Sequence, residues 1–197
     1  MSGIIGSKLN IRGSGRIAKL GTDGQVLTSA GAGQPPAFEA AAAGGKIGQI
    51  QYTQITDTEE TTATSFETIP TLQVTITPSA SDSLIAIDCY LSFCAGASAH
   101  SIVQLFRDAT QIAMGDEDGS TSRAIFGWRS QGADLTYSAW PLQFRWIDNP
   151  ADVSAHTYSM KWYVNTANAW LGRTVDASDS LSYNRSPCSI SASEILA

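Results

Sequence analysis

The chain has 197 residues, of which 43% are hydrophobic and 15% are charged, and its net charge at pH 7 is −6. This composition is typical of a folded protein with one sizeable core, and no stretch approaches the ~18 consecutive apolar residues of a membrane span. The opening residues, MSGIIGSKLNIRG, lack the apolar region of a secretory signal, so we expect synthesis in the cytoplasm.

The first 45 residues differ from the rest of the chain. They hold ten of the 17 glycines and one aromatic residue, Phe38, and their net charge is +2. Subtraction from −6 leaves −8 for residues 46–197, which also hold all five tryptophans. A segment so rich in glycine cannot bury enough apolar surface to offset the conformational entropy that it would lose on folding. We therefore expect an extended anchoring arm over residues 1–45 and a folded body over residues 46–197.

Short apolar groups recur between the glycines of the arm, and its first twenty residues contain basic residues but no acid. This pattern favours a segment that lies extended in a groove of another molecule. An unstructured terminal tail is the alternative. The candidate anchoring residues are Ile4, Ile5, Lys8, Arg12, Arg16 and Lys19.

A polar connector, GTDGQVLTSAGAGQPPAF over residues 21–38, joins the basic end to the body. Its glycines are expected to form bends and its two prolines a stiff exit. The alanines of AFEAAAAGG, residues 37–45, predict at most one helical turn. The candidate connector residues are Gly21, Gly24, Val26, Leu27, Pro35 and Pro36.

The body alternates apolar and polar residues with a period of two, which predicts strands, and clusters of Gly, Pro, Asn, Asp and Ser separate them. About nine short strands at this spacing predict an all-β fold, an antiparallel sandwich or barrel, and their number favours a jelly roll. The predicted strands are residues 46–55, 71–78, 83–95, 101–108, 110–116, 122–130, 135–148, 155–166 and 189–196.

The three cysteines are expected to be reduced and buried. Cys89 and Cys94 differ in parity, so on one strand they face opposite sides of the sheet and do not pair. With Cys188, they contain no CxxC spacing, and His100 and His156 have no evident metal-ligating partner. We expect no metal and no cofactor.

Motifs for nucleotide binding, calcium binding and catalysis fail on context. GSGRIA, residues 13–18, is not followed by a predicted helix, as a dinucleotide fingerprint requires. Residues 116–118 begin an acidic loop that lacks Gly and Glu at the calcium-loop positions. His156 has no evident nucleophile beside it. The acidic body repels phosphate, so no nucleic-acid partner is expected, and no membrane contact either.

The tryptophans are the remaining candidates for a binding surface. Trp146 and Trp162 share the parity of neighbouring core residues and are expected to be buried. Trp128 and Trp170 lie near turns, where an exposed ring would suit a glycan or a protein neighbour, and burial is the alternative for both.

Several segments resemble those of bacteriophage head-fibre and tail-fibre proteins. MSGIIGS at residues 1–7 is similar to their opening, and the connector is similar to a segment that recurs in fibre stalks. KIGQIQYTQI, LQVTITPSASDSLIAI, LFRDATQIA, HTYSMKW and NRSPCSISASEI resemble, in this order, a phage appendage domain of jelly-roll type. The residues that close such a domain correspond to Asn184, Arg185, Glu194 and Ile195 of this chain.

The resemblance implies a homotrimer whose arms join the virion, assembled in the host cytoplasm. Lys8, Arg12, Arg16 and Lys19 would then pair with acidic residues of the major capsid protein or another virion protein, while Val26 and Leu27 pack on sister chains or on the shell.

The leading hypothesis is a non-enzymatic structural protein of the virion, a capsid decoration protein or head fibre anchored through its arm. An arm of 45 residues spans at most ~150 Å, which favours a short appendage. The alternative is a tail-attached receptor-binding fibre protein that binds host surface glycans. A carbohydrate-binding module belongs to a different class, and an enzyme is the least favoured.

Overall fold

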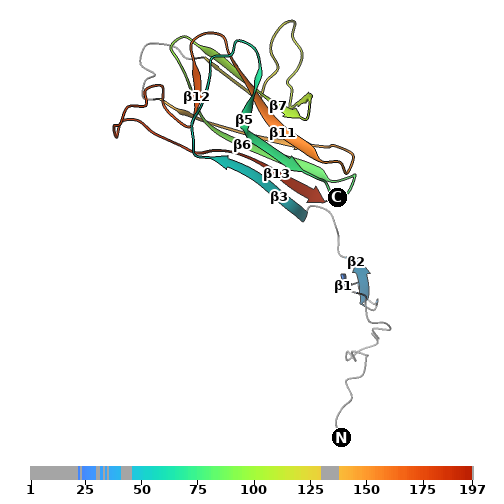
Figure 1. Cartoon of the computed structure of the whole chain (residues 1–197). Coiled ribbons are helices and arrows are strands. Elements are labelled where there is room, and N and C mark those ends of the chain that lie inside the picture. Colours follow the sequence, from blue (N-terminus) through green and yellow to red (C-terminus); the bar gives the residue numbers. More distant parts are fainter. Residues whose placement is uncertain are drawn as a thin grey trace. The chain divides into compact units, whose positions relative to one another are not determined.

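The computed structural model describes residues 22, 24–29, 32, 34, 36–40, 46–129 and 138–196. The chain divides into two units, residues 1–44 and 45–197 (Figure 1). Every regular element among the described residues is a β-strand, so the predicted all-β class is confirmed.

The first unit contains one antiparallel ribbon. Strand β1 (Gln25–Thr28) pairs with β2 (Ala37–Ala40), and Leu27 lies opposite Phe38. The helical turn predicted for residues 37–45 is wrong for β2, because its backbone pairs with β1 and a run of alanines this short cannot nucleate a stable helix on its own. The rest of that prediction lies outside the described residues.

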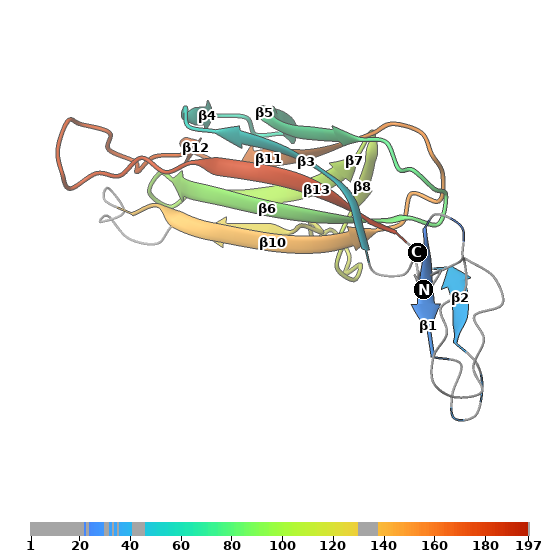
Figure 2. The same ribbon diagram turned by 90° about the horizontal axis from the view of Figure 1, so that it is seen from below.

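The body is a sandwich of two antiparallel sheets. In the first sheet, β6 is the central strand, with β13 and β12 along one edge and β10 along the other. Figure 2 shows β3, β13, β6 and β10 side by side in one layer. The members of this sheet are β3 (Lys46–Ile55), β4 (Glu59–Thr61), β6 (Leu84–Ala95), β10 (Trp140–Asp148), β12 (Ala169–Leu171) and β13 (Cys188–Leu196).

The second sheet lies behind the first in Figure 2 and has β11 between β5 and β7. Strands β8 and β9 both pair with the far edge of β7, one after the other. The members are β5 (Glu67–Ile76), β7 (His100–Arg107), β8 (Thr110–Ile112), β9 (Phe126–Arg129) and β11 (His156–Val164).

The connections follow the jelly-roll order. Successive strands β3, β5, β6 and β7 alternate between the two sheets, β7 to β9 stay in the second, and β10, β11 and β13 alternate again. All nine predicted strands occur. Strands β4 and β12 were not predicted, because each has three residues, too few for a period of two to be recognised. Strand β8 is equally short, but it begins the longer predicted stretch 110–116.

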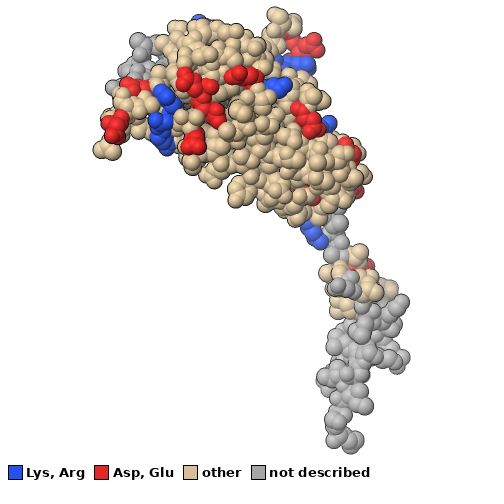
Figure 3. All heavy atoms as spheres, viewed as in Figure 1, with Lys and Arg blue, Asp and Glu red and all other residues tan. Residues whose placement is uncertain are grey.

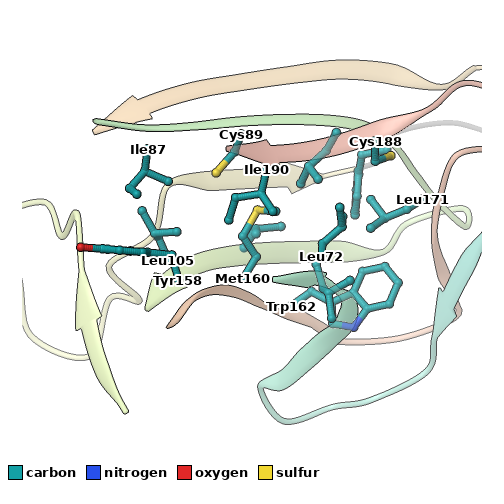
Figure 4. Packing of buried hydrophobic residues seen from close by; sticks show 14 of the residues in the cluster. Leu72, Ile87, Cys89, Leu105, Tyr158, Met160, Trp162, Leu171, Cys188 and Ile190 are labelled. Atoms are coloured by element: carbon teal, nitrogen blue, oxygen red, sulfur yellow. The ribbon is translucent and has the colours of Figure 1, made fainter. Parts of the chain in front are cut away.

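The core lies between β6 and β11. Every second residue of β6, from Ile85 to Phe93, is at most 1% exposed. These side chains meet Tyr158, Met160 and Trp162 of β11 (Figure 4). Each fully buried large side chain contributes roughly 1.5–3 kcal/mol through the area it removes from water.

The three cysteines are free and buried, as predicted. Cys89 lies in the core, where burial raises the pKa of its thiol to about 12. Cys94 has the opposite parity, and its thiol donates a hydrogen bond to the carbonyl oxygen of Arg173 at 3.0 Å. Burial raises the pKa of this thiol to about 12 as well. Neither group is a thiolate at neutral pH, which keeps both unreactive.

Glu194 places a buried carboxylate at the end of β13. Its Oε1 accepts hydrogen bonds from the backbone N–H and the hydroxyl of Ser79, both at 2.6 Å, and its Oε2 accepts one from Gln49 Nε2 at 2.8 Å. A Cβ at Gly48 would lie only 3.0 Å from Oε2 and 2.9 Å from Leu196, so glycine there leaves room for the carboxylate. Burial by itself raises the pKa of Glu194, but these hydrogen bonds outweigh it and hold the pKa at about 2.

We predict that Glu194→Gln destabilises the body at pH 7 and removes part of its acid sensitivity. The folded-state pKa lies below its ordinary value of 4.5, so the contribution of the carboxylate is complete above about pH 4.5 and is lost as the pH falls toward 2. The shift corresponds to an upper bound of roughly 3 kcal/mol. Urea unfolding followed by tryptophan fluorescence between pH 2.5 and 7 measures it.

Glu117→Gln is the matched control, because Glu117 lies exposed in the loop after β8. The two variants should differ by at least about 1 kcal/mol at pH 7 and converge near pH 2.5. If the free energy of unfolding of Glu194→Gln fell as steeply between pH 4.5 and 2.5 as that of the unmodified protein, the low pKa of Glu194 would be contradicted.

Candidate functional site

The anchoring residues of the arm, from Ile4 to Lys19, lie outside the described residues, as do Gly21 and Pro35 of the connector. Their roles therefore stay predictions. The described part of the connector is the ribbon of β1 and β2, with Gly24 and Pro36 each just before a strand.

The ribbon presents apolar side chains to solvent. Gly24 has a φ of 86°, the left-handed region that favours glycine, and a turn closes there through a hydrogen bond from Gln25 N to Thr22 O. Val26 and Leu27 follow with exposed fractions of 45% and 46%. A two-stranded ribbon is marginally stable by itself in water, so these side chains are available to a packing partner.

Trp128 belongs to an aromatic cluster at the open edge of the sandwich. Its ring packs on Trp140 with 4.8 Å between the centroids, and Phe126 meets Phe144 edge to face at 6.0 Å. Both pairs join a residue of β9 in the second sheet to one of β10 in the first. Trp128 is half-buried and Trp140 is 43% exposed.

Sequence reasoning missed Trp140, although it shares the parity of the partly buried Leu142 and Phe144 in β10. It was also wrong about Trp146, which is 38% exposed. The parity of Trp146 does point inward, because it lies opposite Ile87, but β10 is an outer strand that pairs only with β6, so one edge of it is uncovered. Trp162, in the middle of β11, is buried as predicted.

Trp170 is a poorer candidate for an open platform. It lies on β12, half-buried, with the Arg173 guanidinium 5.2 Å from the ring centroid. Its Nε1 is buried and has no hydrogen-bond acceptor within the described part of the chain. One face of the ring is therefore already covered by a cation of the same molecule.

His156 is held between two carboxylates. Its Nδ1 lies 2.8 Å from Asp108 Oδ2 and its Nε2 lies 3.1 Å from Asp152 Oδ1, while the residue itself is 8% exposed. Both ring nitrogens are thus occupied by structural contacts that tie the turn after β7 to the loop before β11. This geometry fits a clamp between loops and leaves neither nitrogen to serve as a general base.

A second cluster lies next to this clamp. Arg107 Nη1 is 2.8 Å from Asp148 Oδ2, and the buried hydroxyl of Tyr158 donates to the same oxygen at 2.7 Å. The pKa of Tyr158 is raised by burial first and by the Asp148 hydrogen bond second. These groups neutralise and satisfy a carboxylate that ends β10, and they too are structural.

Other site types find no support in the part of the chain that the structure covers. No group of three or more His, Cys, Asp and Glu side chains there is placed to hold a metal ion. The acidic residues 116–118 are exposed in a loop. Nor do the described residues include a helix long and apolar enough to cross a membrane. The nucleotide-like motif GSGRIA lies outside the described residues.

Comparisons with known proteins give only distant likenesses. No family model and no curated protein matches the chain. A structure of infectious bursal disease virus, Gt strain, is 11% identical over 92% of this chain, with a TM-score of 0.44. The VP2 subviral particle of infectious bursal disease virus is 10% identical over 87%, with a TM-score of 0.36. This chain spans 44% and 46% of those two chains. At such scores the likeness carries no argument, and the fold assignment depends on the strand order itself.

We predict that replacing His156 changes how stability depends on pH. Burial lowers the pKa of the ring, but the hydrogen bonds that the ring donates to Asp108 and Asp152 outweigh this and raise the pKa above its ordinary 6.5. The stabilisation by the charged ring is therefore complete below about pH 6.5 and is lost as the pH rises through the higher folded-state pKa. The unmodified protein should lose more thermal stability between pH 6 and pH 9 than His156→Gln does.

His100→Gln serves as the control, since the ring of His100 forms no ion pair with any described residue. Its melting temperature should follow that of the unmodified protein across the range. A parallel decline in all three proteins would show that the clamp holds an uncharged ring.

Proposed function

We propose that this protein is a non-enzymatic structural component of a bacteriophage virion, a capsid decoration protein or head fibre, and that residues 1–45 attach it to the particle. The observation that carries the proposal is the contrast between the two parts of the chain. A sandwich with a complete core follows an arm whose described ribbon leaves Val26 and Leu27 exposed. The ordered resemblance of the sequence to phage appendage proteins supports it.

The charges of the arm and the body are consistent with an arm that attaches and a body that projects. The first twenty residues contain four basic residues and no acid, whereas the body has a net charge of −8. An acidic shell would attract the arm and repel the body, so the body would project from the particle. The partner is then the major capsid protein or another acidic protein of the virion.

A homotrimer would strengthen this attachment. Three arms raise the effective concentration of each contact, so that stable decoration requires no single strong contact. The described part of each arm is a short ribbon with a small apolar surface, which fits weak contacts used several times.

We predict that deleting residues 1–20 abolishes binding to virus particles that lack this protein, while the body stays folded. Sedimentation of purified protein with such particles measures binding, and circular dichroism with thermal unfolding confirms the body. Replacing Lys8, Arg12, Arg16 and Lys19 together by Ser should weaken binding and remove most of its salt dependence.

The same number of substitutions in the body, Arg123, Arg129, Arg173 and Arg185 to Ser, is the matched control and should leave particle binding intact. Decoration by the truncated protein at unchanged strength would rule out the arm as the anchor. The copy number per virion separates the two locations, since hundreds of copies are expected on a capsid and at most a few dozen on a tail.

A tail-attached receptor-binding protein is the second candidate. The observation in its favour is the exposed ring of Trp140, which packs at a tilt against Trp128, because flat aromatic faces suit sugar rings. A screen against host surface glycans tests it. This candidate requires that the unmodified protein binds a glycan, that Trp140→Ala abolishes binding, and that Trp170→Ala, with its ring under Arg173, retains it. Absence of glycan binding leaves the capsid proposal.

A further inference from the structure

The outer face of the first sheet changes from polar to apolar along the strands. Residues directly opposite one another in the register share a side of the sheet, so the composition of this face can be followed row by row. Four strands that lie side by side contribute to it (Figure 2). One end row is polar and contains Gln54, Ser189, Tyr90 and Gln143.

The other end of this face is apolar. Ile50, Ser193, Ala86 and Ile147 form one row, and Ile47, Ile195 and Leu84 form the next. Ile47 and Ile50 are 56% and 58% exposed, and Ile147 is 45% exposed, whereas Ala86 is only 7% exposed. We call these seven residues the apolar end of the outer face. It lies where β3 begins and β13 ends.

The face as a whole has no net charge. Among the described residues of these four strands, the outward positions hold one acid and one base, Asp88 and Arg145, and these pair with each other. Arg145 Nε lies 2.6 Å from Asp88 Oδ1, and Arg145 Nη2 lies 2.9 Å from Asp88 Oδ2. Figure 3 shows a wide uncharged area over β3 and β13, with most charges gathered elsewhere on that view. On a body with a net charge of −8, this is a neutral surface.

The outer face carries large side chains along one strand and small side chains along the next. Along β3 stand large side chains, including Tyr52, which is 73% exposed. Along the neighbouring β13 stand the small side chains of Ser189, Ser191 and Ser193. A ridge of large residues beside a strip of small ones allows the ridge of one copy to fit the strip of another.

The size of the face suits a protein partner. Four strands spaced ~4.8 Å apart, each about nine residues long at ~3.3 Å per residue, give a flat area of about 19 Å by 30 Å. This is close to the ~800 Å² per partner of a standard protein interface once side-chain relief is included.

From these observations we infer that the outer face of the first sheet, centred on its apolar end, binds a second copy of this chain. A second copy is a partner that the charges permit, because two bodies of −8 repel each other where their acidic surfaces meet but meet no net charge across this face. A strongly basic or acidic partner would find there only Asp88 and Arg145, which are already paired with each other. The inference rests on the proposed function in that a homotrimer calls for such a face, but it does not depend on where the trimer sits.

The test is the mass of the full chain in solution, measured by light scattering after size exclusion at 1 to 100 µM. The unmodified protein should have a mass of at least twice 20.8 kDa. Ile50→Asp with Ile147→Asp places unpaired carboxylates in the contact and should raise the dissociation constant at least ~100-fold. Val153→Asp is the matched control, since Val153 is 55% exposed in the loop between β10 and β11, and it should leave the mass unchanged.

Ser191→Arg is a second variant that fills the strip of small residues without touching the core, and it should also give monomers. Thermal unfolding of each variant at low concentration verifies that the body is folded. A monomeric unmodified protein at 100 µM, or an oligomer that persists in folded Ile50→Asp/Ile147→Asp and in Ser191→Arg, overturns the inference.

Measuring particle binding as well tests the inference and the proposed function separately. An oligomer that needs this face but does not bind particles supports the inference and contradicts the virion role. A monomer that still binds particles through residues 1–20 does the reverse.

Discussion

The enclosure of every second residue of β6 between the two sheets is the constraint on which the rest of the structure depends. Because Ile85, Ile87, Cys89, Leu91 and Phe93 must point inward, Ala86, Asp88 and Tyr90 must point outward. β6 also has partners on both edges, so its register sets the alignment of β13, β12 and β10. A slip of one residue would expose the core and bury the Asp88–Arg145 pair. The core pattern thus fixes the composition of the outer face, and the surface available for association is a consequence of packing on the other side.

One end of the sandwich is closed by buried carboxylates instead of apolar side chains. Glu194 and Asp148 both lie opposite Ile85, one on each side of β6, and both point inward. Each is satisfied by the loops and strands around it, Glu194 by Ser79 and Gln49, and Asp148 by Arg107 and Tyr158. A buried charge left without such partners would be strongly destabilising, so these bonds fix the loops at this end in one arrangement. It is the end at which the chain enters the body from the arm.

Local patterns were sufficient for some features and insufficient for others. The nine strands, the burial of Trp162 and the free cysteines follow from alternation and composition, because each depends on neighbours within one strand. The contact of Trp128 with Trp140 joins strands of different sheets, and the exposure of Trp146 depends on how little of the second sheet lies opposite β10. The partners of Glu194 depend on a register shift between Ser193 and Ile195. None of these can be seen without the three-dimensional pairing, and the anchoring residues of the arm stay predictions.

The pairing of Lys46 with Leu196 places the first and last described residues of the body side by side, on neighbouring strands. Both ends of the body's described chain thus lie at the same pole, or end, of the sandwich. The opposite pole is formed by the connections after β6 and after β11, which meet through a hydrogen bond from Gly96 N to Asn168 O. A peptide inserted into the loops after β6 or β11 would therefore lie at the end of the body opposite Lys46 and Leu196.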